Sequence, residues 1–291
     1  MKDFTYAAPT TLAEATRLLA GANGSAKILA GGTDIIVQLR EGLREADLVL
    51  DVKKIPELMQ FKYTPQVGLW LGASVPCYKI YENAEIARAY PALADSARII
   101  GGWQIQSRAS IGGNLCNSSP AGDTIPSLIA HHAYCEVVGP NGHRNIAAEN
   151  FCTGPGKNVL QPGEIVVALV FPPTMPHAGS AYERFIPRNE MDIAVVGAAS
   201  RVQIAPSGDK IEFARIGLAA VAATPKYALE ASEWLAGKPL TEEIYAQAGE
   251  LAKKVASPIS DMRGTAEYRV HLVGVLVKRT LAKAIARAQG K

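Results

Sequence analysis

The stretch SIGGNLCNSSPAGDT, which runs from Ser110 to Thr124, contains three glycines and three consecutive polar residues, Asn117, Ser118 and Ser119. It also carries a carboxylate at Asp123. A buried strand or an ordinary helix would not place so many small and polar side chains in one run, because glycine weakens both elements. We therefore interpret this stretch as a loop that binds a ligand.

A second stretch of the same type, LAGGTDI, runs from Leu29 to Ile35. In both stretches an apolar residue leads into Gly-Gly and then into a hydroxyl or amide side chain. Paired glycines permit a positive φ and bring successive backbone N–H groups close to a ligand, where they form an anion-binding nest. The carboxylate of Asp123 suits a ribose or ribityl hydroxyl. Two nests and one such carboxylate predict a dinucleotide ligand, with neutral donors from Thr33, Asn114, Asn117 and Ser118.

The spacing of these glycines excludes two common phosphate-binding motifs. The chain has no G-x-G-x-x-G that opens a βαβ unit and no G-x-x-x-x-G-K-[ST], so neither a Rossmann site nor a P-loop is predicted. Gly-Gly is also frequent in tight turns. From the residues alone, a purely structural role of either loop therefore stays open.

Composition restricts the class of protein. With 291 residues, 48% of them hydrophobic and 20% charged, the chain is expected to fold into one large or several smaller globular domains. It has neither a signal-peptide pattern nor an 18-residue apolar run, so we expect a cytoplasmic location and no membrane insertion. The net charge of +3 without a Lys/Arg block argues against nucleic-acid binding. The four cysteines form no C-x-x-C pair, and we expect reduced thiols and no metal site.

The first part of the chain shows alternating helix and strand signals. A helix is predicted to begin at Leu12, because Thr11 and Glu14 form a capping box. The apolar run AKIL then predicts a strand, TDIIVQLREGL a helix and DLVLDV another strand, which is a mixed α/β arrangement. A second unit begins at Val67 with the strand pattern VGLWLGASV.

Later segments extend this pattern. A helix is predicted over residues 81–98, with Ile86, Ala89, Leu93 and Ala97 on one face, and EIVVALVFPP predicts a strand. The Pro- and Gly-containing stretch PPTMPHAGS is the best boundary between domains. Beyond it, two strand patterns flank APSGDK, which predicts an antiparallel hairpin, and three helical patterns span Pro225 to Ala236, Thr241 to Ala256 and Thr265 to Gln289.

Several motifs together resemble those of a known family. AGGTD, followed about 80 residues later by SIGGNLCNSSPAGDT, is similar to the paired flavin motifs of the FAD subunit of molybdenum hydroxylases. This family includes the carbon monoxide dehydrogenase medium chain and the flavin domain of xanthine dehydrogenase. The segments GPGKNVLQPGEIVV, YERFIPRNEMDIAVVG, RIGLAAVAATPKYALEAS and DMRGTAEYRVHL extend the resemblance over nearly the whole chain.

The resemblance implies an α+β fold. A two-subdomain FAD-binding domain of the PCMH type, also called the vanillyl-alcohol-oxidase type, would span residues 1–176, with subdomains of about 1–57 and 58–176. A small domain of antiparallel sheet and helices would span residues 177–291. One branch of the family, the benzoyl-CoA type, inserts a cysteine-bearing segment for an iron–sulfur cluster. No such insert follows the glycine loop, so no metal is expected in this chain.

The resemblance also implies which residues touch FAD. The first loop and Ser110 to Asn114 would surround the pyrophosphate, and Asn117 and Asp123 would bind the ribityl or phosphate region. Ile100 would contact a ring, although it could equally be a core aliphatic residue, and Lys157 could equally be an exposed loop lysine. Several relatives have Lys at the position of Arg184, which leaves its contact to the flavin ring open. Some members have Tyr at the position of Ile193, so aliphatic packing is expected there instead of ring stacking. The full set is Leu29, Ala30, Gly31, Gly32, Thr33, Asp34, Ile100, Ser110, Ile111, Gly112, Gly113, Asn114, Asn117, Asp123, Lys157, Val166, Arg184, Asp192 and Ile193.

The function implied by the resemblance is electron transfer. FAD in this chain would receive electrons from a molybdenum-cofactor large subunit through a [2Fe-2S] small subunit, in a complex expected to be a dimer of heterotrimers. NAD, a quinone or oxygen would be the final acceptor. A self-contained flavin oxidase or reductase is a second hypothesis, although the part after Pro176 offers only His177 and His271 as histidine catalysts. A third is a nucleotide-binding regulatory protein without redox turnover.

Overall fold

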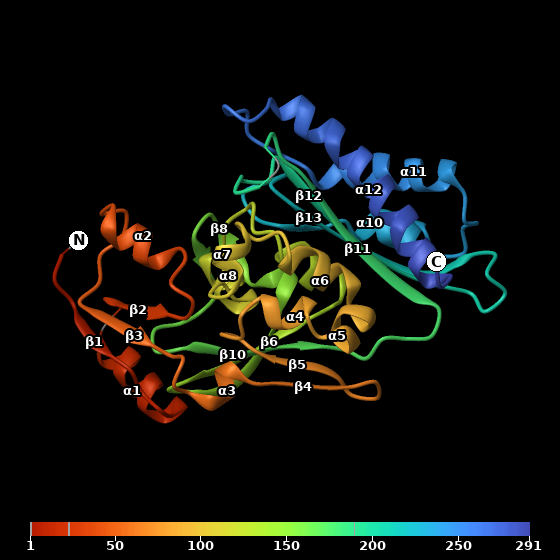
Figure 1. Cartoon of the computed structure of the whole chain (residues 1–291). Helices are drawn as coiled ribbons and strands as arrows, with labels where there is room; N and C mark the ends of the chain where they lie inside the picture. The colour runs from red at the N-terminus through yellow and green to blue at the C-terminus, as the bar shows by residue number, and fades with distance from the viewer. Residues whose placement is uncertain (1, 23, 189) are drawn as a thin grey trace.

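The computed structural model describes residues 2–22, 24–188 and 190–291. Its N-terminal region, up to strand β10, holds a small parallel sheet and a larger antiparallel sheet. Its C-terminal region, from strand β11 onward, holds a second antiparallel sheet covered by helices (Figure 1). The predicted α+β fold class is confirmed by this architecture.

The small parallel sheet has the strand order β1-β3-β2. Helix α1 (Leu12–Gly21) connects its first two strands, and helix α2 (Ile35–Arg40) follows β2. The predicted cap at Thr11 is present, since Thr11 Oγ1 accepts a hydrogen bond from the Glu14 N–H at 3.2 Å, but the reciprocal half of the box is shifted by one residue. The Glu14 carboxylate accepts one in return from Thr10 N–H at 3.2 Å. The sheet comprises β1 (Thr5–Ala7), β2 (Ala26–Leu29) and β3 (Leu48–Asp51).

The larger sheet has the order β4-β5-β10-β6-β7, with antiparallel neighbours throughout. Its central strand β10 is buried on both faces. Ile165 and Val167 pack with residues of α1 and β3, whereas Val166 and Leu169 pack with the helices on the other face. The strands are β4 (Phe61–Thr64), β5 (Gly68–Gly72), β6 (Tyr134–Gly139), β7 (Gly142–Ala147) and β10 (Ile165–Phe171).

The helix predicted over residues 81–98 is broken into two helices that follow a separate helix ending at Tyr81, so this prediction is wrong in its continuity. Asn83 caps a new helix by accepting the Ile86 N–H at 3.0 Å, and Pro91 starts another, because proline favours a first helical turn. The short helices of this region are α3 (Pro56–Met59), α4 (Tyr78–Tyr81), α5 (Ala84–Ala89), α6 (Pro91–Ala97), α7 (Trp103–Gln106), α8 (Ile111–Asn117) and α9 (Ile125–Ala130). A 3-10 turn at Ala148–Asn150 leads to a hairpin of β8 (Cys152–Gly154) and β9 (Lys157–Asn158).

The C-terminal sheet has the order β11-β12-β13-β14. The predicted hairpin is confirmed as β12 (Val196–Ile204) paired antiparallel with β13 (Ile211–Ala219). The last predicted helix is confirmed as α12, with 23 residues, whereas the one predicted from Pro225 begins only at Leu229, because residues 226–227 pair with β13. The other elements are β11 (Ala178–Phe185), β14 (Lys226–Tyr227), α10 (Leu229–Trp234), α11 (Glu242–Ala252), a 3-10 turn (Lys253–Val255) and α12 (Ala266–Ala288).

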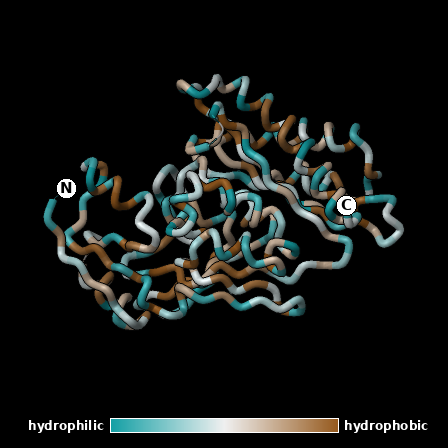
Figure 2. Tube along the Cα trace, viewed as in Figure 1, coloured by the Kyte–Doolittle hydropathy of each residue, from teal (hydrophilic) through white to brown (hydrophobic). Residues whose placement is uncertain are grey.

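Hydrophobic segments follow the strands of the sheets, and along α12 hydrophobic and hydrophilic residues alternate (Figure 2). One face of the C-terminal sheet packs against α12, and its other face meets α6 and α9 of the N-terminal region. No helix in the described part of the chain is both long and apolar enough to cross a membrane.

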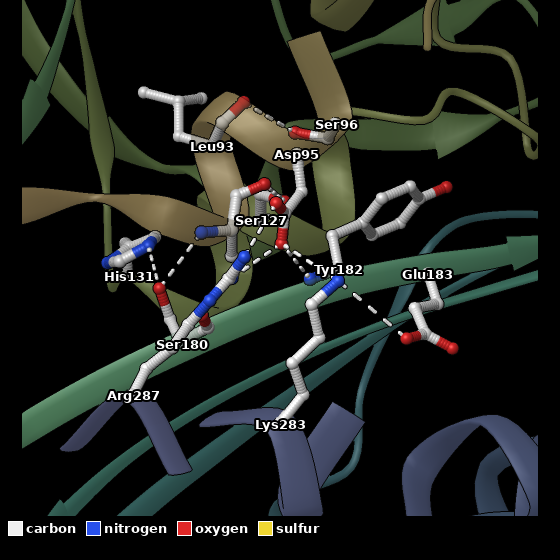
Figure 3. Close-up of polar contacts among 11 residues, drawn as sticks. Leu93, Asp95, Ser96, Ser127, His131, Ser180, Tyr182, Glu183, Lys283 and Arg287 are labelled. Carbon is white, nitrogen blue, oxygen red and sulfur yellow. Dashed lines mark hydrogen bonds and ion pairs between the residues drawn. The ribbon is translucent and has the colours of Figure 1, made fainter. Parts of the chain in front are cut away.

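Polar contacts also join the two regions along the edge strand β11. Asp95 of α6 accepts two hydrogen bonds from the Arg287 guanidinium of α12, at 2.7 and 3.0 Å (Figure 3). The same carboxylate accepts the Tyr182 backbone N–H of β11 at 3.2 Å. Strand β11 is therefore fixed against the N-terminal region through charged as well as apolar contacts.

Candidate cofactor-binding site

The two glycine segments meet at one cavity of about 480 Å³. This volume lies in the usual range of cofactor pockets. Many of the residues predicted from the sequence line it: Ala30, Gly31, Gly32, Thr33, Asp34, Ile100, Ser110, Gly112, Gly113, Asn114, Asn117 and Val166. The structure thus brings together two segments that lie about 80 residues apart in the chain.

The backbone of the first segment touches the backbone of residues 108–109, directly before the second segment. A Cβ built on Gly31 would lie 1.9 Å from the Arg108 carbonyl oxygen, so only glycine permits this approach. Beyond this contact, Gln38 of α2 donates a hydrogen bond to the Asn117 side chain of α8 at 3.2 Å. Lys53 supports the first segment by donating to the Ala30 carbonyl at 3.0 Å. The relative position of the two segments is therefore fixed by the protein itself.

The second segment differs from its prediction, because residues 111–117 form helix α8 rather than a loop. Ser110 caps this helix, and its hydroxyl accepts the Gly113 N–H at 3.0 Å. Among the four glycines of the two Gly-Gly pairs, only Gly32 has a positive φ, of 84°. The prediction that both segments form anion-binding nests with positive-φ glycines is therefore wrong for the second segment. The second segment instead presents the first turn of a helix, where backbone N–H groups lack intrahelical partners.

Gly112 and Gly113 face different surroundings within this turn. A Cβ on Gly112 would lie 2.4 Å from the Ala73 carbonyl oxygen, so this glycine lets α8 pack against the chain after β5. A Cβ on Gly113 would meet only the Ser110 hydroxyl, at 2.9 Å. Since Gly113 lines the cavity, its missing side chain leaves room for a ligand to approach the backbone.

The polar groups around this turn suit a diphosphate. Asn114 Oδ1 accepts a hydrogen bond from the Thr124 hydroxyl at 2.7 Å. The amide NH₂ group of Asn114 therefore points away from Thr124 and can donate to a ligand. Thr33 and Asn117 also line the cavity, and they donate without adding charge. Apolar side chains line the remainder and suit a flat ring system: Ala26, Ile28, Val52, Leu58, Ile100, Ile165 and Val166. FAD, with its diphosphate and two ring systems, fits these donors and this apolar wall.

The hairpin β8–β9 closes one side of the cavity. Its Gly156 N–H donates to the Ser118 carbonyl at 3.0 Å, and its Asn158 amide donates to the Cys116 carbonyl at 3.1 Å. Ser118 ends α8 in the left-handed conformation, with φ of 50°. Asn158 lines the cavity, whereas Lys157 is exposed on the hairpin and does not. The cofactor contact of Lys157 therefore stays a prediction.

Cys116, the cysteine within the second glycine segment, lines the cavity. Burial raises the pKa of its thiol to about 12, so the thiol stays protonated at neutral pH. A thiol that stays protonated is a poor nucleophile and a poor redox group. Cys116 is one of four free cysteines.

Several other predicted residues lie outside this cavity. Leu29 packs with the core residues around Leu39, and Ile111 is buried in the main core of the N-terminal region. A neighbouring polar cleft is lined by Arg98, Gly101 and residues 182–188, which include Arg184. Asp123 lines neither the cavity nor this cleft. Asp192 pairs with Arg188 at 3.3 Å, and Ile193 is 52% exposed. Among the described residues, the geometry therefore assembles the two glycine segments but separates Asp123, Lys157, Arg184, Asp192 and Ile193 from the cavity wall.

Some lining residues were missed by the sequence analysis. Gln38, Arg44, Ser74 and Glu164 reach the cavity from segments that carry no glycine motif. Gln38 lies four residues after Asp34 on the helix that the first glycine segment opens, so helical periodicity could have identified it. Ser74 has no local signal, since it reaches the site only because β5 pairs with β10.

The fold and this cavity define a protein that binds a dinucleotide cofactor between two sheets. Comparison with known protein families identifies the class of this protein. Residues 2–174 match the family described as the FAD binding domain in molybdopterin dehydrogenase, and residues 180–284 match the CO dehydrogenase flavoprotein C-terminal domain.

The chain belongs to this family of FAD-binding subunits. It is 33% identical to the xanthine dehydrogenase FAD-binding subunit of Escherichia coli O157:H7, over 100% of this chain and 99% of that protein. Its structure is similar to that of carbon monoxide dehydrogenase from Hydrogenophaga pseudoflava, with a TM-score of 0.93, 30% identity and 98% coverage of both chains. Quinoline 2-oxidoreductase from Pseudomonas putida 86 gives a TM-score of 0.89 at 27% identity, over 100% of this chain and 99% of that one. The predictions of a flavoprotein oxidoreductase subunit and of FAD as its cofactor are confirmed.

Proposed function

We propose that this chain transfers electrons through FAD within a multi-subunit molybdenum hydroxylase. When bound, FAD supplies the redox chemistry, and the protein contributes binding, orientation and electrostatics. The observation that carries the proposal is the cavity formed by two glycine segments, in a chain that matches FAD-binding subunits over its whole length. The exposed His177 and His271 line neither the cavity nor the polar cleft, which argues against a self-contained flavoenzyme that uses a histidine catalyst.

For the cofactor, we assign the diphosphate to the two glycine segments. Ala30 to Asp34 would approach it from one side and Ser110 to Asn114 from the other, with Asn117 donating nearby. Ile100 and Val166 would contact the rings. Arg184, Asp192 and Ile193 would lie at the flavin end of the site, beyond the cavity itself.

We further propose the organisation of the chain and of its complex. Residues 1–176 form the FAD-binding domain, with subdomains of about 1–57 and 58–176, and residues 177–291 form the C-terminal domain. The partners are an iron–sulfur small subunit and a molybdenum-cofactor large subunit, arranged as a dimer of heterotrimers in the cytoplasm. Support for these partners comes from relatives whose names describe one chain of a larger enzyme, such as the carbon monoxide dehydrogenase medium chain.

A pull-down of the tagged chain from its native cells tests this function. The expected eluate contains two further chains together with FAD, iron and molybdenum, identified by absorbance spectra and metal analysis. A lone yellow protein that turns over a small substrate without iron or molybdenum would contradict the proposal. A colourless chain that takes up no added FAD would contradict the cofactor itself.

A further inference from the structure

The first glycine segment begins where β2 ends. Strands β2 and β3 are parallel neighbours, with Leu29 beside Asp51, so both strands end on the same side of the small sheet (Figure 1). Open sheets with parallel strands place their ligands at the carboxyl ends of those strands. The residues that follow β3 therefore lie next to the first glycine segment and can act on it.

Asp51 and Lys53 form a turn at the end of β3. Asp51 Oδ1 accepts the Lys53 backbone N–H at 3.1 Å, which is a local turn that aspartate favours. The same oxygen accepts a hydrogen bond from Lys53 Nζ at 2.7 Å. The ammonium group also donates to the Ala30 carbonyl at 3.0 Å. One carboxylate thus holds the Lys53 side chain where it reaches the residue that follows β2.

The hydrogen bond from Lys53 sets the orientation of the peptide bond between Ala30 and Gly31. In a planar trans peptide the C=O and N–H groups point in opposite directions. Since the Ala30 carbonyl points toward Lys53 Nζ, the Gly31 N–H points away from it. Gly31 lines the cavity, and its N–H donates to no backbone carbonyl of the described residues. The Lys53 contact therefore fixes the direction of a donor that is available to a ligand.

Lys53 itself stands outside the cavity wall. Among the described residues, those that line the cavity include Val52 but neither Asp51 nor Lys53. The charges of Lys53 and Asp51 are paired at 2.7 Å, with the two side chains 28% and 13% exposed. A pair of opposite charges at this distance presents little net charge to a phosphate further away. The effect of Lys53 on the site is therefore transmitted through the Ala30 carbonyl.

We propose that Lys53 is a positioning residue for the cofactor diphosphate and that Asp51 holds Lys53 in place. The inference rests on the proposed function, which assigns the diphosphate to the two glycine segments. Lys53 orients the peptide between Ala30 and Gly31 so that the Gly31 N–H faces a diphosphate oxygen. Because this donor is oriented before the cofactor binds, its ordering does not reduce the affinity.

Titration of the purified apo-chain with FAD, followed by flavin fluorescence, tests the proposal. Lys53→Met keeps an unbranched side chain but removes the donor, so the affinity should fall about tenfold, the size expected for one hydrogen bond to a charged group. Lys53→Arg should recover most of the affinity, because it restores a charged donor. Asp51→Asn should weaken FAD binding about threefold by itself and add nothing in the Lys53→Met background, because Asp51 acts through Lys53. Equal losses from Asp51→Asn in both backgrounds would contradict this order of action.

Tyr6→Phe is the matched control. The Tyr6 hydroxyl donates to the other oxygen of the Asp51 carboxylate, at 2.7 Å, and Tyr6 does not line the cavity. Its removal should leave the FAD affinity within about twofold of the wild type, because the Lys53 contact with Ala30 remains. Equal losses of affinity in Lys53→Met and Tyr6→Phe would overturn the proposal, since any disturbance of Asp51 would then suffice.

Salt separates orientation of the peptide from attraction by charge. The loss in Lys53→Met should be the same in about 0.05 M and about 0.5 M NaCl, whereas attraction between separated charges is screened over this range. A loss that disappears at high salt, or an unchanged affinity in Lys53→Met, would overturn the proposal. If Lys53→Met does not fold, an unchanged affinity in Asp51→Asn would overturn it instead. Failure of the wild-type chain to bind FAD would contradict the proposed function itself, so the two failures are distinguishable.

Discussion

The two Gly-Gly pairs look alike in the sequence but differ in what each glycine does. Gly31 and Gly112 each allow another backbone to approach, at Arg108 and Ala73, and Gly32 alone has a positive φ. Gly113 has open space next to it apart from the Ser110 hydroxyl. Three of the four glycines therefore serve the fold, and one leaves open space at the cavity. A glycine motif that binds a cofactor is thus also a packing motif for the segments that hold the cofactor.

The largest effect is expected for Gly112→Val. Its side chain would collide with the Ala73 backbone, which cannot rotate away, so we expect the free energy of unfolding to fall by about 3 kcal/mol. Urea denaturation monitored by circular dichroism measures the change. A variant as stable as the wild type would show that the close approach of α8 to Ala73 is not required.

The neighbouring substitution, Gly113→Val, is the matched control. Valine is a better helix former than glycine, and any disturbance of the Ser110 cap costs about 1 kcal/mol. The two effects oppose each other, so the free energy of unfolding should change little. The affinity for FAD should nevertheless fall about 100-fold, or roughly 2.7 kcal/mol, because the side chain enters the cavity. Titration of the apo-chain with FAD, followed by flavin fluorescence, measures this loss. Equal losses of stability in the two valine variants would remove the distinction between Gly112 and Gly113.

An intermediate effect is expected for Gly32→Ala. With φ of 84°, the position strains any residue that carries a Cβ, at a cost of about 1–2 kcal/mol. Gly24→Ala is the control, because Gly24 has a φ of 87° and no atom near its Cβ position. Thermal unfolding of the two variants separates the cost of backbone strain from that of the side-chain contact. A larger loss at Gly32 is predicted, because the Ile36 side chain lies 2.7 Å from the added Cβ.

The smallest effect concerns Glu164, which lines the cavity without belonging to either glycine pair. Arg144 lowers the pKa of this carboxyl through two hydrogen bonds, at 2.7 and 2.8 Å. Because the pKa is lowered in the folded state, the pair stabilises the protein above the ordinary Glu value of about 4.3, and the stabilisation is lost as the pH falls further. Since Arg144 is partly exposed, Glu164→Gln should cost at most about 0.5 kcal/mol at pH 7. A cost that persists at pH 3 would mean that packing, and not charge, is responsible.

Local signals predicted much of the fold. The helix cap at Thr11, the β12–β13 hairpin and α12 depend on neighbours in the sequence, and all three are confirmed. The helix over residues 81–98 was predicted as continuous, because its apolar spacing outweighed the local signals at Asn83 and Pro91. Helix α8 was missed since Gly-Gly has low helix propensity, and its packing on Ala73 overrides that preference.

The candidate site was predictable only in part, for a related reason. The glycine segments carry a strong local pattern, so most of their residues were found. The environment of Asp123 depends on Tyr182 and Arg184, which lie about 60 residues further along the chain, and no local pattern links them. Long-range pairing of this kind is visible only once β11 packs against the N-terminal region.

A crystal structure of the chain loaded with FAD tests the central claim most directly. The account predicts the diphosphate between the two glycine segments, with its oxygens within hydrogen-bond distance of backbone N–H groups at residues 31–34 and 110–114. Gly113 should lie against the ligand, and Gly112 should remain packed on Ala73. FAD phosphates bound elsewhere, with this cavity left to solvent, would contradict it.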